Sequence, residues 1–182
     1  VDYFQGDRSY IFLINKNGTL DNAYECCRDG VEPQIDKLQG GDIHFIDRWM
    51  PYFKENKALV TPDVEKIRES KPEEYRILTE QDIHSMAEAP LYNENQLIGF
   101  VGIDNPSPEK IENTGELLVS LAYAVANAYI RAVKEQEQRE MFSHTIQSLF
   151  MANPESLCTF RVNLTKNICY EAHGVSRYVL NS

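Results

Sequence analysis

Near its middle the chain reads Ala89-Pro90-Leu91-Tyr92-Asn93-Glu94-Asn95-Gln96-Leu97-Ile98-Gly99-Phe100-Val101-Gly102-Ile103-Asp104-Asn105-Pro106, two apolar segments around a polar turn. Residues 93–96 tolerate turn geometry, so the segments on either side are predicted to fold back as an antiparallel strand pair. Asp104-Asn105-Pro106 then ends the second strand. Because a long helical pattern follows, the first expectation for the fold is strand, turn, strand and helix.

Upstream of this hairpin the sequence predicts three more strands. Residues 10–15 are apolar on both alternating faces, as expected of a central strand, and a turn leads from them into a second strand over 19–27. A short run over 57–61 is the third. With strands over 83–91 and 96–104 in the hairpin, the expected sheet has at least five antiparallel strands.

Helices are predicted between these strands. One covers 43–56, with Asp42 as its cap, and Pro51 must lie in its first turns or kink it. Residues 62–79 are charged, interrupted by proline and only weakly periodic, which predicts a variable lid. The prediction of a helix over 43–56 is based on aromatic residues at helical spacing, namely Phe45, Trp49, Tyr52 and Phe53.

A long helix is predicted to begin at Ile111, after a proline-containing first turn. Its apolar stripe is wide enough to cover a sheet and also to meet a second subunit. Residues 134–140 are charged on all sides, so 134–153 are expected to form a helical linker that stands in solvent or in a coiled coil. A strand pattern over 158–164 then indicates the truncated start of a second domain over 154–182.

Composition narrows the possible partners. The formal net charge of -10 opposes binding to a polyphosphate backbone, so no nucleic-acid partner is expected. The longest uncharged run, 117–130, is too short to span a bilayer, and no apolar N-terminal segment with basic flanks occurs. We therefore expect a cytoplasmic fragment of a longer protein, without membrane contact.

Four cysteines occur, at Cys26, Cys27, Cys158 and Cys169, in a spacing that matches no zinc or haem-attachment motif. Buried free thiols in a reducing compartment are the simplest interpretation. The histidines are isolated in the sequence, so no metal site is expected. No glycine-rich phosphate loop or nucleophile elbow occurs either, so the sequence predicts no catalysis by this fragment and no bound cofactor.

The phrase Gly99-Phe100-Val101-Gly102-Ile103-Asp104-Asn105, with the order of elements around it, resembles the GAF domain family. The resemblance covers roughly residues 1–138, and the domain itself is expected over 1–133. It implies an α+β fold, with an antiparallel sheet of five to six strands flanked by helices and a long C-terminal signalling helix. It also implies a small-molecule cavity beneath the lid and a homodimer formed through the terminal helices.

The resemblance places specific residues in these two sites. The dimer interface is expected at Ile111, Leu118, Leu121, Val125, Ala128 and Ala132. The same aromatic residues that would line a ligand cavity would also fill an ordinary core, so both interpretations stay open. The ligand cavity is expected to be lined by Phe12, Tyr24, Trp49, Phe53, Asp63, Tyr75, His84 and Met86.

Residues 160–169 resemble the opening hairpin of PAS-like modules that often precede GGDEF cyclase domains. The resemblance therefore implies a sensory domain that relays ligand occupancy to a downstream module, most simply a diguanylate cyclase, with a histidine kinase or a transcription regulator as alternatives. A ligand-free dimerising spacer is the second hypothesis. The third is a GAF-type methionine sulfoxide reductase, for which Cys26 and Cys27 are the candidate thiols, although Glu25 beside them opposes thiolate formation.

Overall fold

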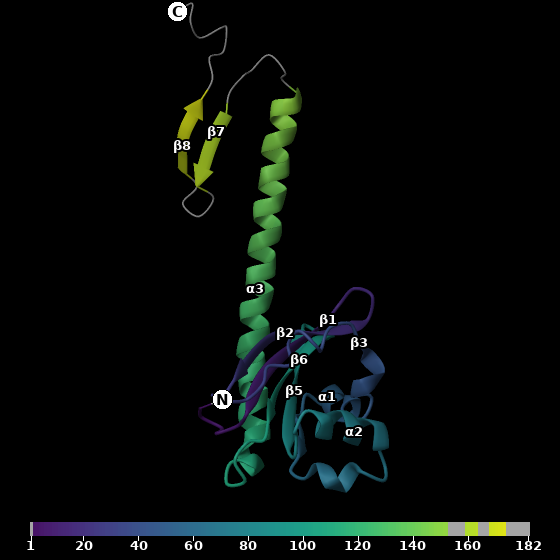
Figure 1. Cartoon of the computed structure of the whole chain (residues 1–182). Coiled ribbons are helices and arrows are strands. Elements are labelled where there is room, and N and C mark those ends of the chain that lie inside the picture. Colours follow the sequence, from purple (N-terminus) through teal and green to yellow (C-terminus); the bar gives the residue numbers. More distant parts are fainter. Residues whose placement is uncertain (1, 153–158, 164–167, 174–182) are drawn as a thin grey trace, which may run out of the picture. The chain divides into compact units, whose positions relative to one another are not determined.

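The computed structural model describes residues 2–152, 159–163 and 168–173. A six-stranded antiparallel sheet has the strand order β3-β2-β1-β6-β5-β4 (Figure 1). This confirms the predicted α+β class and the antiparallel sheet. The strands of the sheet are β1 (Arg8–Ile14), β2 (Thr19–Cys27), β3 (Gly41–Asp42), β4 (Leu59–Thr61), β5 (Met86–Asn93) and β6 (Gln96–Asp104).

Short helical elements fill the segment between β3 and β5, and one long helix follows β6. The first helix was predicted over 43–56 as one piece, and the structure corrects this. The 3-10 helix η1 is capped by Asp42, which accepts from the His44 amide, but Pro51 lacks an N–H and opens a separate α1. The helical elements are η1 (Ile43–Ile46), α1 (Met50–Lys54), η2 (Val64–Ile67), α2 (Pro72–Glu80) and α3 (Ile111–Ala152).

The hairpin quoted above is formed by β5 and β6, and Glu94 takes a positive φ of 55° in its turn. Strand β5 begins at Met86 rather than at residue 83, which corrects the predicted boundary. The amides of His84 and Ser85 donate instead to the side-chain oxygen of Asn105, at 2.8 and 3.1 Å. Asn105 thereby ends β6 and fixes the start of β5 at the same time.

The sheet has a packed core on each face. Leu118, Ala122 and Ala126 of α3 pack against one face, together with Ala87 and Ile103 of the sheet. Side chains of η1, α1 and α2 pack against the other face, as Figure 1 shows for the helices. Strands β5 and β6 therefore contribute alternate residues to both cores.

Helix α3 begins at Ile111, as predicted, and approaches the sheet closely because Gly115 has no side chain. A β-carbon there would stand 3.0 Å from Val60 of β4. By length and composition alone, one segment of the described helices, Asn113–Ser148, is long and apolar enough to cross a membrane. The chain divides into two compact units, Val1–Ala128 and Tyr129–Ser182.

In the second unit, β7 (Thr159–Asn163) pairs antiparallel with β8 (Ile168–His173). The rest of the predicted second domain, including Cys158, lies outside the described residues. The PAS-like nature of 154–182 and the boundaries 1–133, 134–153 and 154–182 stay predictions.

Candidate functional site

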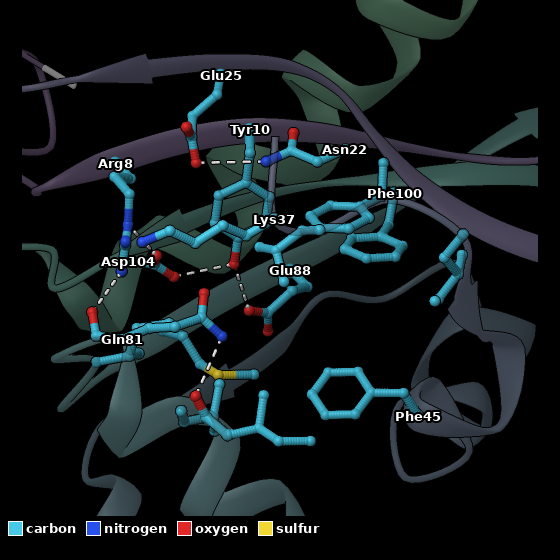
Figure 2. A pocket seen from close by; sticks show the side chains of 18 of the residues that line it. Arg8, Tyr10, Asn22, Glu25, Lys37, Phe45, Gln81, Glu88, Phe100 and Asp104 are labelled. Carbon is cyan, nitrogen blue, oxygen red and sulfur yellow. Dashed lines mark hydrogen bonds and ion pairs between the residues drawn. The ribbon is translucent and has the colours of Figure 1, made fainter. Parts of the chain in front are cut away.

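A cavity of about 290 Å³ lies on the face of the sheet opposite α3. Strands β1, β2, β5 and β6 form its floor, and its walls come from residues 37–45, from Trp49 and from the C-terminal half of α2 (Figure 2). Most of the lining is apolar, but buried charged groups gather at one end. This combination is typical of small-molecule sites.

Strand register brings the floor residues together in three rows. Tyr10 of β1 lies opposite Gly102 of β6, which in turn lies opposite Glu88 of β5. On one side of this row Arg8 pairs with Asp104, and on the other side Phe12 pairs with Phe100. Paired residues in a sheet point to the same face. The floor therefore changes from charged to aromatic along the strands. The row of Tyr10, Gly102 and Glu88 is the middle row and lies between the charged pair and the aromatic pair, as Figure 2 shows.

Gly102 is required for the middle row. A β-carbon at this position would stand 2.2 Å from the ring of Tyr10, so the phenol lies across the space that a side chain would occupy. This arrangement lets Tyr10 reach over β6 to a residue of β5. Its hydroxyl oxygen is 3.1 Å from Oε1 of Glu88 and 3.0 Å from Oδ1 of Asp104.

The Tyr10 hydroxyl has a single proton, so it donates to only one of these two carboxyl groups. The other contact is a hydrogen bond only when that carboxyl is itself protonated and donates to the phenol oxygen. Asp104 also accepts from Nε of Arg8 at 3.0 Å, whereas Glu88 has no cationic partner among its hydrogen bonds. Glu88 is therefore the group that gains most from holding a proton.

The electrostatic environment also favours the protonated form of Glu88. Glu88 is fully buried, and burial raises its pKa well above the ordinary value of 4.5, with the nearby Asp104 charge adding to the effect. Burial also raises the pKa of Asp104 to about 6, because loss of hydration outweighs the attraction of Arg8. The pKa of Tyr10 is raised by burial and by both carboxyl groups.

The Trp49 wall is held by an ion pair between Arg48 and Glu74 of α2. The guanidinium donates from Nε to both carboxylate oxygens, at 3.0 and 2.9 Å, and from Nη2 to Oε1 at 2.6 Å. The indole N–H of Trp49 donates to the same Oε1 at 3.1 Å. The pair is largely buried, with exposed fractions of 19% and 7%, so it anchors α2 over the cavity.

Of the eight residues predicted to line the cavity, the structure places Phe12, Trp49 and Met86 in the lining. Phe53 lies behind it, fully buried with its ring 6.3 Å from that of Phe100. Ligand binding by any of them stays a prediction. Tyr24, Asp63, Tyr75 and His84 lie elsewhere.

These four placements correct the sequence-based expectation. The register between β1 and β2 shifts at Ile11/Phe12, so Tyr24 pairs with Ile11, whose side chain packs on the α3 face, and Tyr24 is 58% exposed. Asp63 caps η2. The Tyr75 hydroxyl donates to exposed Glu65, and His84 is exposed beside Asp82.

The charged end of the cavity was missed by the sequence analysis. The same shift that turns Tyr24 away places Glu25 in the lining, beside Asn22, which pairs with Phe12. Glu88 had a signal that was overlooked: it is a single carboxylate between Ala87 and Ala89 in a buried strand. Over the described residues, no three histidine, cysteine or acidic side chains are grouped so that they would hold a metal ion.

The six predicted dimer positions on α3 also differ in their surroundings. Ile111 and Leu118 are buried within their own chain, Leu118 against the sheet, which removes both from any interface. Leu121 is 42% exposed and Val125 half-buried, while Ala128 and Ala132 are exposed. Dimerisation itself stays a prediction.

Replacing Gly102 by alanine is expected to lower the free energy of unfolding by about 1–3 kcal/mol, since the new methyl group forces Tyr10 from its place. Thermal and denaturant unfolding measure the loss. Tyr10→Phe is the matched control. It removes both hydroxyl contacts and leaves the ring, so it measures the loss of those contacts without the steric clash. A Gly102→Ala protein as stable as the wild type would contradict the close packing of this row.

Comparison with known proteins relates this architecture to one family. Residues 1–129 match the GAF domain family. The methanogenesis regulatory histidine kinase FilI of Methanothrix harundinacea is 28% identical over 139 residues. That alignment covers 70% of this chain and 15% of the kinase, so this chain spans a small part of that relative's length.

Solved structures show the same fold at low sequence identity. The GAF domain of PixJ from Thermosynechococcus elongatus, in its blue-light-absorbing form, superposes with a TM-score of 0.55 at 16% identity, covering 79% of this chain and 86% of that domain. A domain assigned to a two-component sensor histidine kinase of Sinorhizobium meliloti 1021 gives 0.53 at 19% identity, covering 76% and 91%.

Proposed function

This chain belongs to the GAF domain family, and from that premise we propose that it is a sensory domain whose cavity binds a small molecule and whose α3 helix transmits occupancy to another part of a longer signalling protein. The observation that carries the proposal is the cavity itself. It stays open between the sheet and α2, and buried polar groups at one end face into it. A domain serving only as a spacer would gain stability by filling such a space.

The sheet offers a direct route from the cavity to α3. In β5, Glu88 lines the cavity while its neighbours Ala87 and Ala89 pack on the α3 side; in β6, Phe100 and Val101 divide in the same way. A ligand that moves these strands therefore moves the surface on which α3 rests. Transmission requires that the ligand bind one arrangement of the helix more tightly than another, and couplings of about 1–3 kcal/mol are typical.

For the downstream module, the relatives favour a histidine kinase. One relative is a regulatory histidine kinase and one similar structure is assigned to a sensor kinase, whereas the diguanylate cyclase suggested by the tail of the chain has no such support. The cyclase stays the second candidate. The cytoplasmic location is likewise part of the proposal.

A sulfoxide reductase is disfavoured by the surroundings of the thiols. Neither Cys26 nor Cys27 lines the cavity. Burial, followed by the Glu25 charge, raises the pKa of the Cys27 thiol, although Arg8 acts in the opposite direction. Because the thiolate is the reactive form, this environment opposes nucleophilic attack on a sulfoxide.

We also propose that the chain dimerises through the exposed face of α3. Leu121 is 42% exposed, and Val125 and the exposed Ala128 follow it at helical spacing on the same side of α3. Leu121→Glu is expected to weaken the dimer by about tenfold or more, because it places a charge in an apolar contact. Light scattering after size exclusion measures this, with Ser120→Glu, on the neighbouring exposed position, as the control. A monomeric wild type, or an unchanged Leu121→Glu dimer, would contradict the interface.

Native mass spectrometry after incubation with a small-molecule cell extract tests the sensory proposal. The wild-type chain is expected to retain extra mass. Ile77→Trp should lose it, because Ile77 lines the cavity and the larger ring fills it, whereas Arg76→Trp, on the exposed side of α2, should keep it. Bare chain mass in the wild type, or extra mass retained by Ile77→Trp, would argue against a ligand in this cavity.

A further inference from the structure

Two buried acceptor atoms in the cavity lining have no hydrogen-bond partner. They are Oε2 of Glu88 and Oδ1 of Asn22, whose side chains are 0% and 2% exposed. The Asn22 amide nitrogen is used by Glu25, which fixes the orientation of the amide. Figure 2 shows one oxygen of Glu88 joined to Tyr10 and the other directed away from it. A buried acceptor without a hydrogen-bond partner destabilises the folded protein. A ligand that donates a hydrogen bond to either atom would therefore bind favourably.

The charges of the lining are unbalanced. Four carboxyl groups line the cavity, against the two cationic side chains Arg8 and Lys37. Arg8 is occupied by Asp104 and by the Gln81 carbonyl, and Lys37 bonds to Glu32 outside the lining. The lining therefore contains more carboxyl groups than cationic side chains, and no cationic side chain is bonded to Glu88. The lining carboxyl groups are Glu25, Asp42, Glu88 and Asp104.

We propose that this cavity binds a cationic molecule with a flat apolar body, such as an aryl-alkyl amine or an amidine, and that its charged group donates to the free oxygen of Glu88. The amide oxygen of Asn22 offers a second acceptor at the same polar end. The inference rests on the proposed sensory function and names the chemical class of its ligand. A charge-assisted hydrogen bond to a buried carboxylate is among the stronger contacts available to a small ligand.

The aromatic part of the lining fits the flat body. Phe12 and Phe100 stack with their ring centres 4.9 Å apart and their planes inclined by 8°. Trp49 stands edge-on to Phe100 at 5.1 Å, and Phe45 lies beyond Trp49. A ring inserted here meets ring faces and edges, which is a favourable environment for aromatic groups.

Binding of a cation should be coupled to release of a proton. Without a ligand, burial raises the pKa of Glu88 and favours its protonated form, and the side chain faces the Tyr10 hydroxyl on β1 and the Asp104 carboxyl on β6. Glu74 of α2 adds to this effect and Arg48, before α1, opposes it. A bound ammonium favours the carboxylate, so the proton passes to the buffer. The affinity for the cation should therefore rise with pH for as long as free Glu88 remains protonated.

Calorimetry on the whole 182-residue chain tests this with three probes of similar shape. Tryptamine is cationic, 3-ethylindole is neutral and indole-3-propionate is anionic. Tryptamine is expected to bind about tenfold or more tightly than the other two. Its heat of binding should differ between buffers of different ionisation enthalpy, since protons are released, and its affinity should be higher at pH 8 than at pH 6.

Glu88→Gln keeps the shape of the side chain and removes its charge. It is expected to lower tryptamine affinity about tenfold or more, whereas Glu116→Gln, on the exposed side of α3, should leave it unchanged. If the Gln variant proves poorly folded, the buffer dependence of the wild type decides alone. Equal binding of the neutral or anionic probe, an unaffected Glu88→Gln protein, or no binding of tryptamine would overturn the cationic class. Native mass spectrometry would still judge the sensory function separately, because it makes no assumption about ligand charge.

Discussion

Replacing Arg48 by methionine is expected to lower the free energy of unfolding by about 3–5 kcal/mol, the usual cost of leaving one partner of a buried ion pair without the other. Glu74 is 7% exposed and would keep only the Trp49 indole as a donor. For a chain of this size the loss corresponds to a fall of roughly 10 °C in the melting temperature. Thermal unfolding at neutral pH measures it.

Two controls isolate the buried pair. Arg76 and Glu80 form an exposed pair on the same helix, with exposed fractions of 62% and 60%, and Arg76→Met should cost at most about 0.5 kcal/mol. Adding Glu74→Gln to Arg48→Met should restore a large part of the stability, because no charge is then left buried. Strictly additive losses in the double variant would contradict the interpretation.

Glu88→Gln is expected to change how stability depends on pH. Burial raises the pKa of Glu88 in the folded protein, so the folded state holds a proton that the unfolded chain has lost above about pH 4.5. This contribution to stability is therefore present at low pH and declines as pH rises, by up to about 1.4 kcal/mol for each pH unit. Glutamine cannot ionise, so the variant should gain stability relative to the wild type as pH increases.

The comparison uses denaturant unfolding of both proteins between pH 4.5 and 8.5, with Glu116→Gln as the surface control. Asp104, whose pKa is raised to about 6, contributes in the same direction between its ordinary value of 3.8 and about 6, and both proteins contain it. The difference in unfolding free energy between the variant and the wild type therefore measures the ionisation of Glu88. A difference independent of pH would show that Glu88 is ionised and stabilised in some other way.

The sequence predicted the sheet and α3 because their signals are local. Continuous apolar runs mark β1 and β6, and turn residues mark the hairpin around Glu94. Its errors have local physical causes as well. Pro51 divided one expected helix in two, and the Asn105 side chain took the amides that would have begun β5.

The cavity was harder to predict because it depends on how distant strands are aligned. A shift by one residue between β1 and β2 exchanges Tyr24 for Glu25 in the lining. The row of Tyr10, Gly102 and Glu88 joins residues that are far apart in the chain, and periodicity contains no information on such pairing. Trp49 was found because a large aromatic side chain favours burial, although the exposed Tyr24 shows that strand register decides which aromatic residues reach the cavity.

The protonation state of Glu88 is the most direct measure of the site described here. Carbon-detected NMR of the glutamate carboxyl groups, titrated with pH and assigned by comparison with Glu88→Gln, would report it. We expect one carboxyl that titrates well above the ordinary range in the free chain and shifts toward lower pH when tryptamine is added. Titration of every glutamate near its ordinary pKa would mean that Glu88 is hydrated or already paired. That result would contradict the proposal that Glu88 is unpaired in the free chain and binds a cationic ligand.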